Sequence, residues 1–208
     1  MRHIKVKKVN CNICNSENYS LFVKGKDHLL NTDNVYTAVK CNNCDFIYLN
    51  PRPIDLLSLH EEDSYDLYSL KPKEKTNTFV YSNLRKIWRV FIRLIFGKNN
   101  WLLKGIKKGK LLDVGCSSGS YIYELKQRGW DVTGVEPNTF AAKKAKELGL
   151  NIINSTLENA KINTTFEVIS MKNVIEHLPN PQDTLKIINN CLNKNGLLLI
   201  LLLVLFLM

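Results

Sequence analysis

The second half of the chain alternates between short apolar runs and longer stretches that end at a glycine. The apolar runs predict strands at 111–114, 131–135, 151–153, 166–171 and from Leu197 onward. The stretches between them predict helices at 120–128, 139–148 and 183–192, followed by Gly129, Gly149 and Gly196. Strands that alternate with helices favour parallel pairing. The pattern therefore predicts an α/β fold with a doubly wound parallel sheet.

The first half of the chain has a different pattern, in which strand-like runs surround pairs of cysteines. Small antiparallel strands are predicted at 19–23, 35–40 and 46–49. Asn50-Pro-Arg-Pro53 then breaks the chain, and a helical candidate with an apolar stripe follows at 76–96. We expect three parts: a small ribbon at 1–50, a helical linker or lid at 51–109, and the α/β domain at 110–208.

Two Cys-x-x-Cys pairs give the first part its candidate chemistry. Cys11 and Cys14 are separated from Cys41 and Cys44 by 26 residues. Four thiolates complete a tetrahedral shell, so the spacing predicts a zinc ribbon with a closed, structural zinc ion. A ribbon without its metal and redox-active thiols are the alternatives. Cysteines of this kind suit a reducing compartment, and the charged stretch Met1–Val9 has no apolar signal core, so we expect a cytoplasmic protein.

The net charge of +10 is concentrated in one segment. Residues 71–110 contain 12 basic residues and Glu74 as the single acidic one, whereas residues 111–208 contain nine of each. A basic segment can face phosphate in nucleic acid, nucleotide-sugars or anionic lipid, and it can equally be a solvated helix face. We expect its helical part, 79–96, to pack as a lid; weak membrane association and contact with RNA are the alternatives.

The stretch Leu111–Tyr121, LLDVGCSSGSY, has the order strand, glycine-bearing turn and helix start. Glycine lets a ligand approach the backbone, and the helix start presents unpaired N–H groups to that ligand. Glu136 ends the second strand, 21 residues after Gly115, where a carboxylate can accept hydrogen bonds from both hydroxyls of a ribose. The sequence therefore predicts a nucleotide-like cofactor at the carboxyl end of the first strand.

Five motifs, in order over about residues 111–200, resemble the class I S-adenosylmethionine-dependent methyltransferases. They are LLDVGCSSGSY, VTGVEPN, STLEN, FEVISMKNVIEHLPNP and NKNGLLLI. The resemblance implies a Rossmann-like fold. The cysteine module followed by LNPRP is similar to the zinc-binding module fused to a subset of these enzymes, which includes sugar C-methyltransferases and enzymes of cell-surface polysaccharide biosynthesis. A dehydrogenase is a weaker alternative, because the turn lacks the full G-x-G-x-x-G pattern.

The resemblance implies a binding site for S-adenosyl-L-methionine. Asp113 would hold the turn and the amino end of the cofactor, while Gly115 and Gly119 would let the backbone approach its methionine and ribose. Glu136 would bind the ribose hydroxyls. The other members are Cys116, a small buried residue of the turn, and Thr156, Leu157 and Glu158 near the adenine. Ser117 replaces the middle glycine of the commonest pattern and is compatible with the turn if its φ is negative.

Methyl transfer requires a positioned acceptor and, for a hydroxyl or an acidic carbon, removal of a proton. His177 lies just beyond the fourth strand, where such folds place acceptor-side groups, and histidine is a side chain that can exchange a proton near neutral pH, so His177 is a candidate base. The alternative is that His177 only caps or packs its helix. Weaker candidates are Tyr65, Tyr68, His60 and Glu176.

We expect methyl transfer to a small molecule, such as a nucleotide-sugar or a surface-glycan intermediate. A ribosomal-RNA methyltransferase and a non-catalytic truncated remnant are the alternatives. The apolar run 197–208 is longer than a buried strand and shorter than a membrane span. We therefore expect a truncated domain with an incomplete sheet of five strands, in which the fifth is an exposed apolar edge. A tail that touches a membrane is the alternative.

Overall fold

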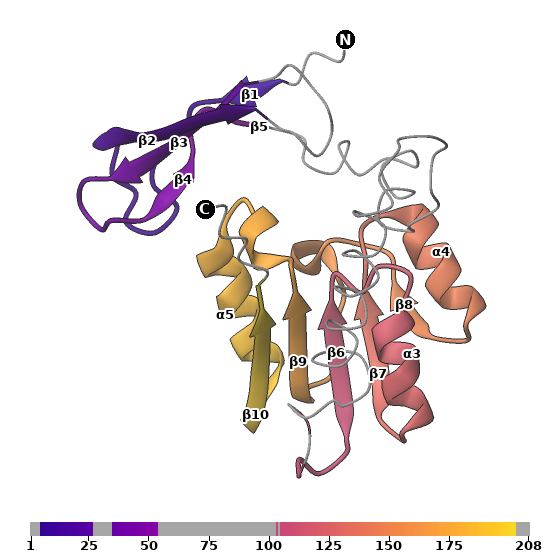
Figure 1. Cartoon of the computed structure of the whole chain (residues 1–208). Coiled ribbons are helices and arrows are strands. Elements are labelled where there is room, and N and C mark those ends of the chain that lie inside the picture. The colour runs from indigo at the N-terminus through magenta and orange to yellow at the C-terminus, as the bar shows by residue number, and fades with distance from the viewer. Residues whose placement is uncertain (1–4, 27–34, 54–102, 104, 203–208) are drawn as a thin grey trace, which may run out of the picture.

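The computed structural model describes residues 5–26, 35–53, 103 and 105–202. Within these residues the chain forms two small antiparallel sheets and one five-stranded parallel sheet (Figure 1). Most of the expected linker or lid lies outside the described residues. So do the candidates Tyr65, Tyr68 and His60, the helical candidate 79–96 and the end of the apolar run.

The parallel sheet contains the strands that the apolar runs predict. They are β6 (Lys110–Val114), β7 (Asp131–Val135), β8 (Asn151–Ile153), β9 (Phe166–Lys172) and β10 (Leu192–Leu201). Every pairing is parallel, and the order across the sheet is β10-β9-β6-β7-β8. The chain order switches direction between β6 and β9, and α/β sheets bind ligands beyond the carboxyl ends of their strands at such a point. The predicted doubly wound sheet is confirmed.

Helices lie between the strands. They are α3 (Ser120–Gln127), α4 (Thr139–Glu147) and α5 (Pro181–Cys191), with short 3-10 helices η4 (Leu157–Asn159) and η5 (Ile175–His177). The N–H groups of Gly129 and Gly149 donate to carbonyls in the last turns of α3 and α4, so these glycines end the helices as predicted. No helix in the described residues is both long and apolar enough to cross a membrane.

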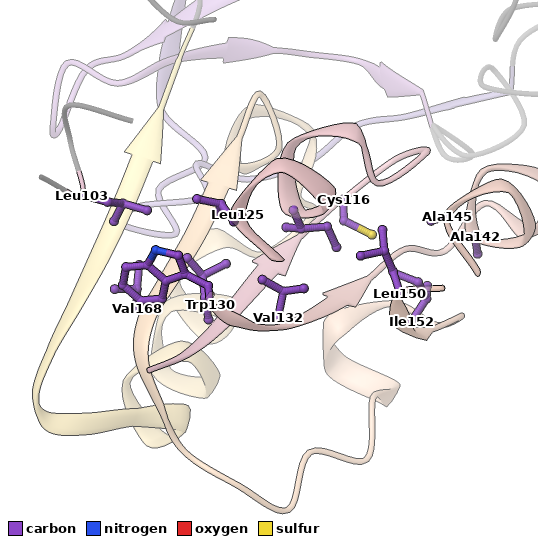
Figure 2. Close-up of a cluster of buried hydrophobic side chains, with 12 residues drawn as sticks. Leu103, Cys116, Leu125, Trp130, Val132, Ala142, Ala145, Leu150, Ile152 and Val168 are labelled. Atoms are coloured by element: carbon purple, nitrogen blue, oxygen red, sulfur yellow. The ribbon is translucent and has the colours of Figure 1, made fainter. Parts of the chain in front are cut away.

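Neighbouring residues of the central strands serve opposite faces of the sheet, as the pleat of a strand requires. Leu111 packs with Leu125 of α3 and Ala142 of α4 in one buried cluster, part of which Figure 2 shows. Leu112 packs on the other face with Ile188 of α5. A sheet covered on both faces favours strands that are mainly apolar, and this explains the mainly apolar runs in the sequence.

The N-terminal part forms a small module around the two cysteine pairs. Its strands are β1 (Val6–Lys7), β2 (Tyr19–Lys26), β3 (Val35–Cys41), β4 (Ile47–Leu49) and β5 (Arg52–Pro53). β2, β3 and β4 form the predicted antiparallel sheet. β1 pairs with β5, and Asn50 supports this pair by accepting the N–H of Val9 at 3.2 Å and donating to its carbonyl at 3.1 Å. The pairing continues beyond residue 50, where the sequence predicts the ribbon to end.

β10 is the edge of the parallel sheet in the part of the chain that the structure describes. It pairs with β9, and its register shifts between Leu192 and Leu197. The strand therefore starts before the predicted residue, because α5 ends at Cys191 and the chain enters the sheet directly. Leu197 and Ile200 are 37% and 40% exposed. The expected apolar edge strand is confirmed for these residues.

Gly119 and Gly149 have similar backbone angles but different surroundings, and they allow a controlled test of the packing. Their φ angles are 79° and 73°. A Cβ atom added at Gly119 would lie 2.5 Å from Cδ1 of Leu150 and 2.9 Å from Cβ of Ala145, whereas one at Gly149 would meet nothing within 4 Å. Gly149→Ala should lower the free energy of unfolding by about 1 kcal/mol, the cost of the left-handed φ, and Gly119→Ala by about 3 kcal/mol because crowding adds to that cost. Urea denaturation measures both values, and equal losses would contradict this packing.

Candidate functional site

Three residues of the turn that joins β6 to α3 lie in the left-handed region. The φ angle is 71° at Gly115, 53° at Ser117 and 79° at Gly119. The condition stated for Ser117, a negative φ, is not met, and the turn accommodates the serine with a positive φ. The serine holds a conformation that glycine adopts without strain, at a cost on the order of 1 kcal/mol. The N–H groups of Gly115 and Cys116 both donate to the carbonyl of Val135, at 2.8 and 3.2 Å, and they attach the turn to the end of β7.

Close neighbours surround the start of this turn. A Cβ atom at Gly115 would lie 2.5 Å from Cγ2 of Val174, so the loop after β9 packs directly on the turn. The Cys116 side chain is 5% exposed, and burial raises the pKa of its thiol. Its sulfur occupies the space beside Gly134 of β7. The Cys116 side chain is therefore a packing group, as predicted for a small buried residue.

Glu136 connects the turn to the start of α4. Its Oε2 accepts the N–H of Ser117 at 2.8 Å, and its Oε1 accepts the N–H of Asn138 at 2.9 Å. The residue is 8% exposed. Burial raises the pKa of its carboxyl, although the N–H groups of Asn138 and Ser117 act in the opposite direction. A carboxylate has about four acceptor sites, so two backbone donors leave capacity for the hydroxyls of a ribose.

A polar cluster lies beside the turn, between β6 and β9. Asp113 is 1% exposed and accepts a hydrogen bond from Oγ of Ser170 at 2.6 Å. The Lys172 ammonium lies 3.1 Å from the centre of the Tyr121 ring, which belongs to the first turn of α3. Burial raises the pKa of the Asp113 carboxyl and lowers the pKa of the Lys172 ammonium, while the attraction between the two charges opposes both shifts.

Sequence reasoning missed Lys172. The sequence did contain a signal, because a lysine directly follows the predicted strand Phe166–Met171. In the structure this strand, β9, includes Lys172 as its last residue. Met171 pairs with Val114, the last residue of β6, so Lys172 follows at the level of the glycine turn. A carboxylate and an ammonium at one sheet edge suit a ligand that carries both charges, such as an amino acid group.

The segment expected beside the adenine lies after β8. Thr156 precedes η4, Leu157 is buried in the core on the α5 side of the sheet, and Oε1 of Glu158 accepts a hydrogen bond from Thr184 of α5 at 3.0 Å. Nδ2 of Asn154 donates to the carbonyl of Glu136 at 2.8 Å. This hydrogen bond brings the segment to the edge of the sheet that carries Glu136.

The loop after β9 carries the expected acceptor-side residues. Glu176 and His177 lie on η5, and both are exposed. The N–H of His177 donates to the carbonyl of Val174 at 2.9 Å, and Val174 is the residue that packs against Gly115. His177 is thus attached to the loop that contacts the glycine turn.

The two cysteine pairs form knuckles of the same shape. The N–H of Asn15 donates to the carbonyl of Cys11 at 2.9 Å, and the N–H of Asp45 donates to the carbonyl of Cys41 at 3.0 Å. Asn15 and Asp45 also share a left-handed conformation, with φ of 58° and 60°. Each knuckle therefore folds back on its first cysteine and brings the two thiols of its pair together.

The four cysteine sulfurs converge on one point. The Sγ atoms of Cys11, Cys14, Cys41 and Cys44 all lie within 4.8 Å of one another, and the Cys11–Cys44 and Cys14–Cys41 distances are both 3.5 Å. Zinc–sulfur bonds of about 2.3 Å place the sulfurs of a tetrahedral site about 3.8 Å apart, so this arrangement fits zinc. Four thiolates fill such a shell and leave no position for a substrate. A metal bound here would be structural.

Comparison with known proteins identifies the family of the α/β domain. A protein-family model described as "Methyltransferase domain" matches residues 83–204, which is more than half of the chain. The chain belongs to this family of methyltransferase domains. The five-stranded parallel sheet with its helices agrees with a Rossmann-like methyltransferase fold, and the predicted recognition is confirmed at the level of the class I S-adenosylmethionine-dependent methyltransferases.

The curated relatives share part of this methyltransferase chain. The ubiquinone biosynthesis O-methyltransferase of Rickettsia canadensis is 33% identical over 46% of this chain and 43% of its own length. The protein of the same name from Actinobacillus pleuropneumoniae serotype 7 is 36% identical over 42% of this chain and 41% of its own. The match thus spans less than half of these relatives.

A solved structure gives independent support for the fold. The plantazolicin methyltransferase BpumL, in complex with SAH, is 19% identical and has a TM-score of 0.50, over 68% of this chain and 54% of its own. At this identity the likeness shows the fold alone. It agrees with the Rossmann-like arrangement of the described strands.

The raised pKa of Asp113 predicts a particular pH dependence of stability. The folded state keeps the Asp113 proton to a higher pH than the unfolded chain does, so the contribution of this group to the free energy of unfolding falls as pH rises from about 4 through the raised pKa. Asp113→Asn keeps an acceptor for Ser170 but cannot titrate. The variant should therefore gain stability relative to the wild type as pH rises. Urea denaturation from about pH 4 to about pH 8 measures this.

The matched control is Asp131→Asn, which removes an exposed carboxylate from the neighbouring strand β7. The difference between the two variants isolates the effect of burial at Asp113. Parallel pH profiles for Asp113→Asn and the wild type would contradict the burial of a titrating carboxyl beside the turn.

Proposed function

We propose that the chain transfers the methyl group of S-adenosyl-L-methionine to a small-molecule acceptor, and that this acceptor is a nucleotide-sugar or a surface-glycan intermediate. The observation that carries the cofactor assignment is the Glu136 carboxylate, which lies at the carboxyl end of β7 and accepts the N–H of Ser117 in the glycine turn. Membership of the methyltransferase-domain family supports it. The four-cysteine module supports the sugar assignment through its resemblance to the module of sugar C-methyltransferases.

The residues at the sheet edge fit the parts of this cofactor. Glu136 would accept the ribose hydroxyls, and the backbone from Gly115 to Gly119, with Cys116, would line the methionine and ribose. The carboxylate of Asp113 and the ammonium of Lys172 would face the amino and carboxylate ends of the methionine. The segment Thr156, Leu157 and Glu158 would flank the adenine.

When bound, the cofactor supplies a methyl carbon that its positive sulfonium activates. The chain must hold the acceptor in line with that carbon and take up the acceptor proton. We propose that an imidazole nitrogen of His177 accepts the proton of a hydroxyl or an acidic carbon. The bound cofactor would supply the methyl carbon for the new bond to the acceptor, and its sulfur would keep the electrons of the carbon–sulfur bond that is lost. The exposure of His177 on η5 leaves it accessible to an acceptor.

We further propose that the four cysteines bind a structural zinc ion. The fit of their sulfurs to a tetrahedral shell supports this. A module of about 50 residues buries little apolar surface, so the metal would supply much of its folding free energy. Thiolates that bind zinc suit a reducing compartment, in agreement with the expected cytoplasmic location.

Calorimetry with S-adenosylhomocysteine tests the cofactor assignment. The wild-type chain should bind this product, and Glu136→Gln should weaken binding at least tenfold (about 1.4 kcal/mol or more), because an amide offers one acceptor oxygen where the carboxylate offers two. Glu147→Gln is the matched control, since it removes an exposed acid from the end of α4. Circular dichroism checks that all three proteins are folded.

Absence of binding to the folded wild-type chain would refute the proposed function. Transfer of a labelled methyl group distinguishes between the two candidate classes of acceptor. Labelling of a nucleotide-sugar mixture supports the proposal, whereas salt-sensitive labelling of ribosomal RNA instead would favour the alternative suggested by the basic segment 71–110.

A further inference from the structure

The N-terminal module contacts the loop between β9 and α5. Nδ2 of Asn12 donates to the carbonyl of Pro179 at 2.7 Å, and Nε2 of Gln182 donates to the carbonyl of Ile13 at 2.8 Å. Asn12 and Ile13 are the two residues between the cysteines of the first knuckle. One knuckle of the candidate zinc site therefore touches the methyltransferase domain directly.

Arg52 reinforces this contact from a second element of the module. Its two terminal nitrogens donate to neighbouring carbonyls, to Leu178 at 2.7 Å and to Pro179 at 3.2 Å. Arg52 lies on β5, which pairs with β1, and it follows Asn50, whose buried side chain bonds to Val9. The module thus positions the guanidinium, which donates hydrogen bonds to two adjacent carbonyls of the loop. A planar guanidinium with two parallel N–H donors favours this geometry.

The loop in contact with Arg52 is the one that carries the acceptor-side residues. Leu178 follows His177 immediately, and Pro181 begins α5. At its other end, Val174 occupies the space beside Gly115 of the cofactor turn. Residues 174–180 therefore run between the cofactor turn and the N-terminal module, with Glu176 and His177 between the two attachments.

We propose that Arg52 and Asn12 are positioning residues that set the conformation of the loop 174–180, so that metal binding by the cysteine knuckles is coupled to the geometry of the acceptor side. This inference rests on the proposed function for the roles of the metal and of His177. The carbonyls of Leu178 and Pro179 are the points of contact, and neither is part of the cofactor turn. The module therefore acts on the acceptor side and leaves cofactor binding to the turn and Glu136.

Hydrogen exchange measured by mass spectrometry on the whole chain tests this. The N–H groups of His177 and Leu178 are bonded within residues 174–180 and report the opening of this loop. Arg52→Ala should speed exchange over residues 174–180 at least about fivefold, the scale expected for loss of hydrogen bonds from a charged donor. Arg52→Lys should give an intermediate rate, because lysine can reach one of the two carbonyls but lacks the fork.

The two knuckles offer a matched pair of variants. Asn12 and Asn42 occupy the same place after the first cysteine of each pair. Asn12 donates to the loop, whereas the Asn42 side chain donates to Asn18 and accepts from Ser20 inside the module. Asn12→Ala should speed loop exchange and Asn42→Ala should leave it at the wild-type rate. Because Asn12 is at the surface contact, this pair decides the question even if Arg52→Ala fails to fold.

Measurements of zinc content and of S-adenosylhomocysteine affinity distinguish a failure of this inference from a failure of the proposed function. Removal of zinc with a chelator should also speed loop exchange, while affinity for S-adenosylhomocysteine stays within about twofold in every variant. Unchanged loop exchange in both Arg52→Ala and Asn12→Ala would overturn the inference, as would equal acceleration in β6 and β7. A chain that binds no zinc, or whose zinc removal leaves the loop unchanged, would overturn the coupling to metal. Absence of S-adenosylhomocysteine binding by the wild type would refute the proposed function instead.

Discussion

Close packing around the backbone of one turn is the constraint on which the rest of the candidate site depends. Val174 occupies the space that a side chain at Gly115 would need, and Leu150 does the same at Gly119. The turn is attached to β7 through the carbonyl of Val135 and through Glu136. Because Gly115 and Gly119 have no side chains, other residues can pack directly on the turn. The turn of five residues therefore brings the ends of β6 and β7 into contact with the loop after β9.

This arrangement divides the site into two sides with different supports. The proposed cofactor side depends on the sheet, whose buried strands fix the turn, Glu136 and the Asp113–Lys172 cluster. The proposed acceptor side depends on a loop attached to the sheet at Val174 and to the N-terminal module at Leu178 and Pro179. The proposed coupling would give a physical reason why the four cysteines and the methyltransferase domain occur in one chain.

The apolar runs predicted the sheet well because each central strand is buried on both faces and ends at a turn residue. The bounds of β7 match the prediction for this reason, and those of the outer strand β8 match as well. α5 starts at Pro181, two residues before the predicted start, although a proline at the first helical position is a readable signal. The positive φ of Ser117 could not be read from the sequence, because a serine carries no mark of a left-handed backbone conformation. The Arg52 contacts join residues more than 120 positions apart, and no local pattern encodes such a pairing.

A crystal structure of the chain with S-adenosylhomocysteine would test the central claim most directly. The account predicts that both ribose hydroxyls lie within about 2.5–3.0 Å of the Glu136 carboxylate oxygens, the range of a strong hydrogen bond between a hydroxyl and a carboxylate. It also predicts that the methionine end lies over Gly115 to Gly119. A ligand bound elsewhere on the chain, or a ribose that does not touch Glu136, would contradict it.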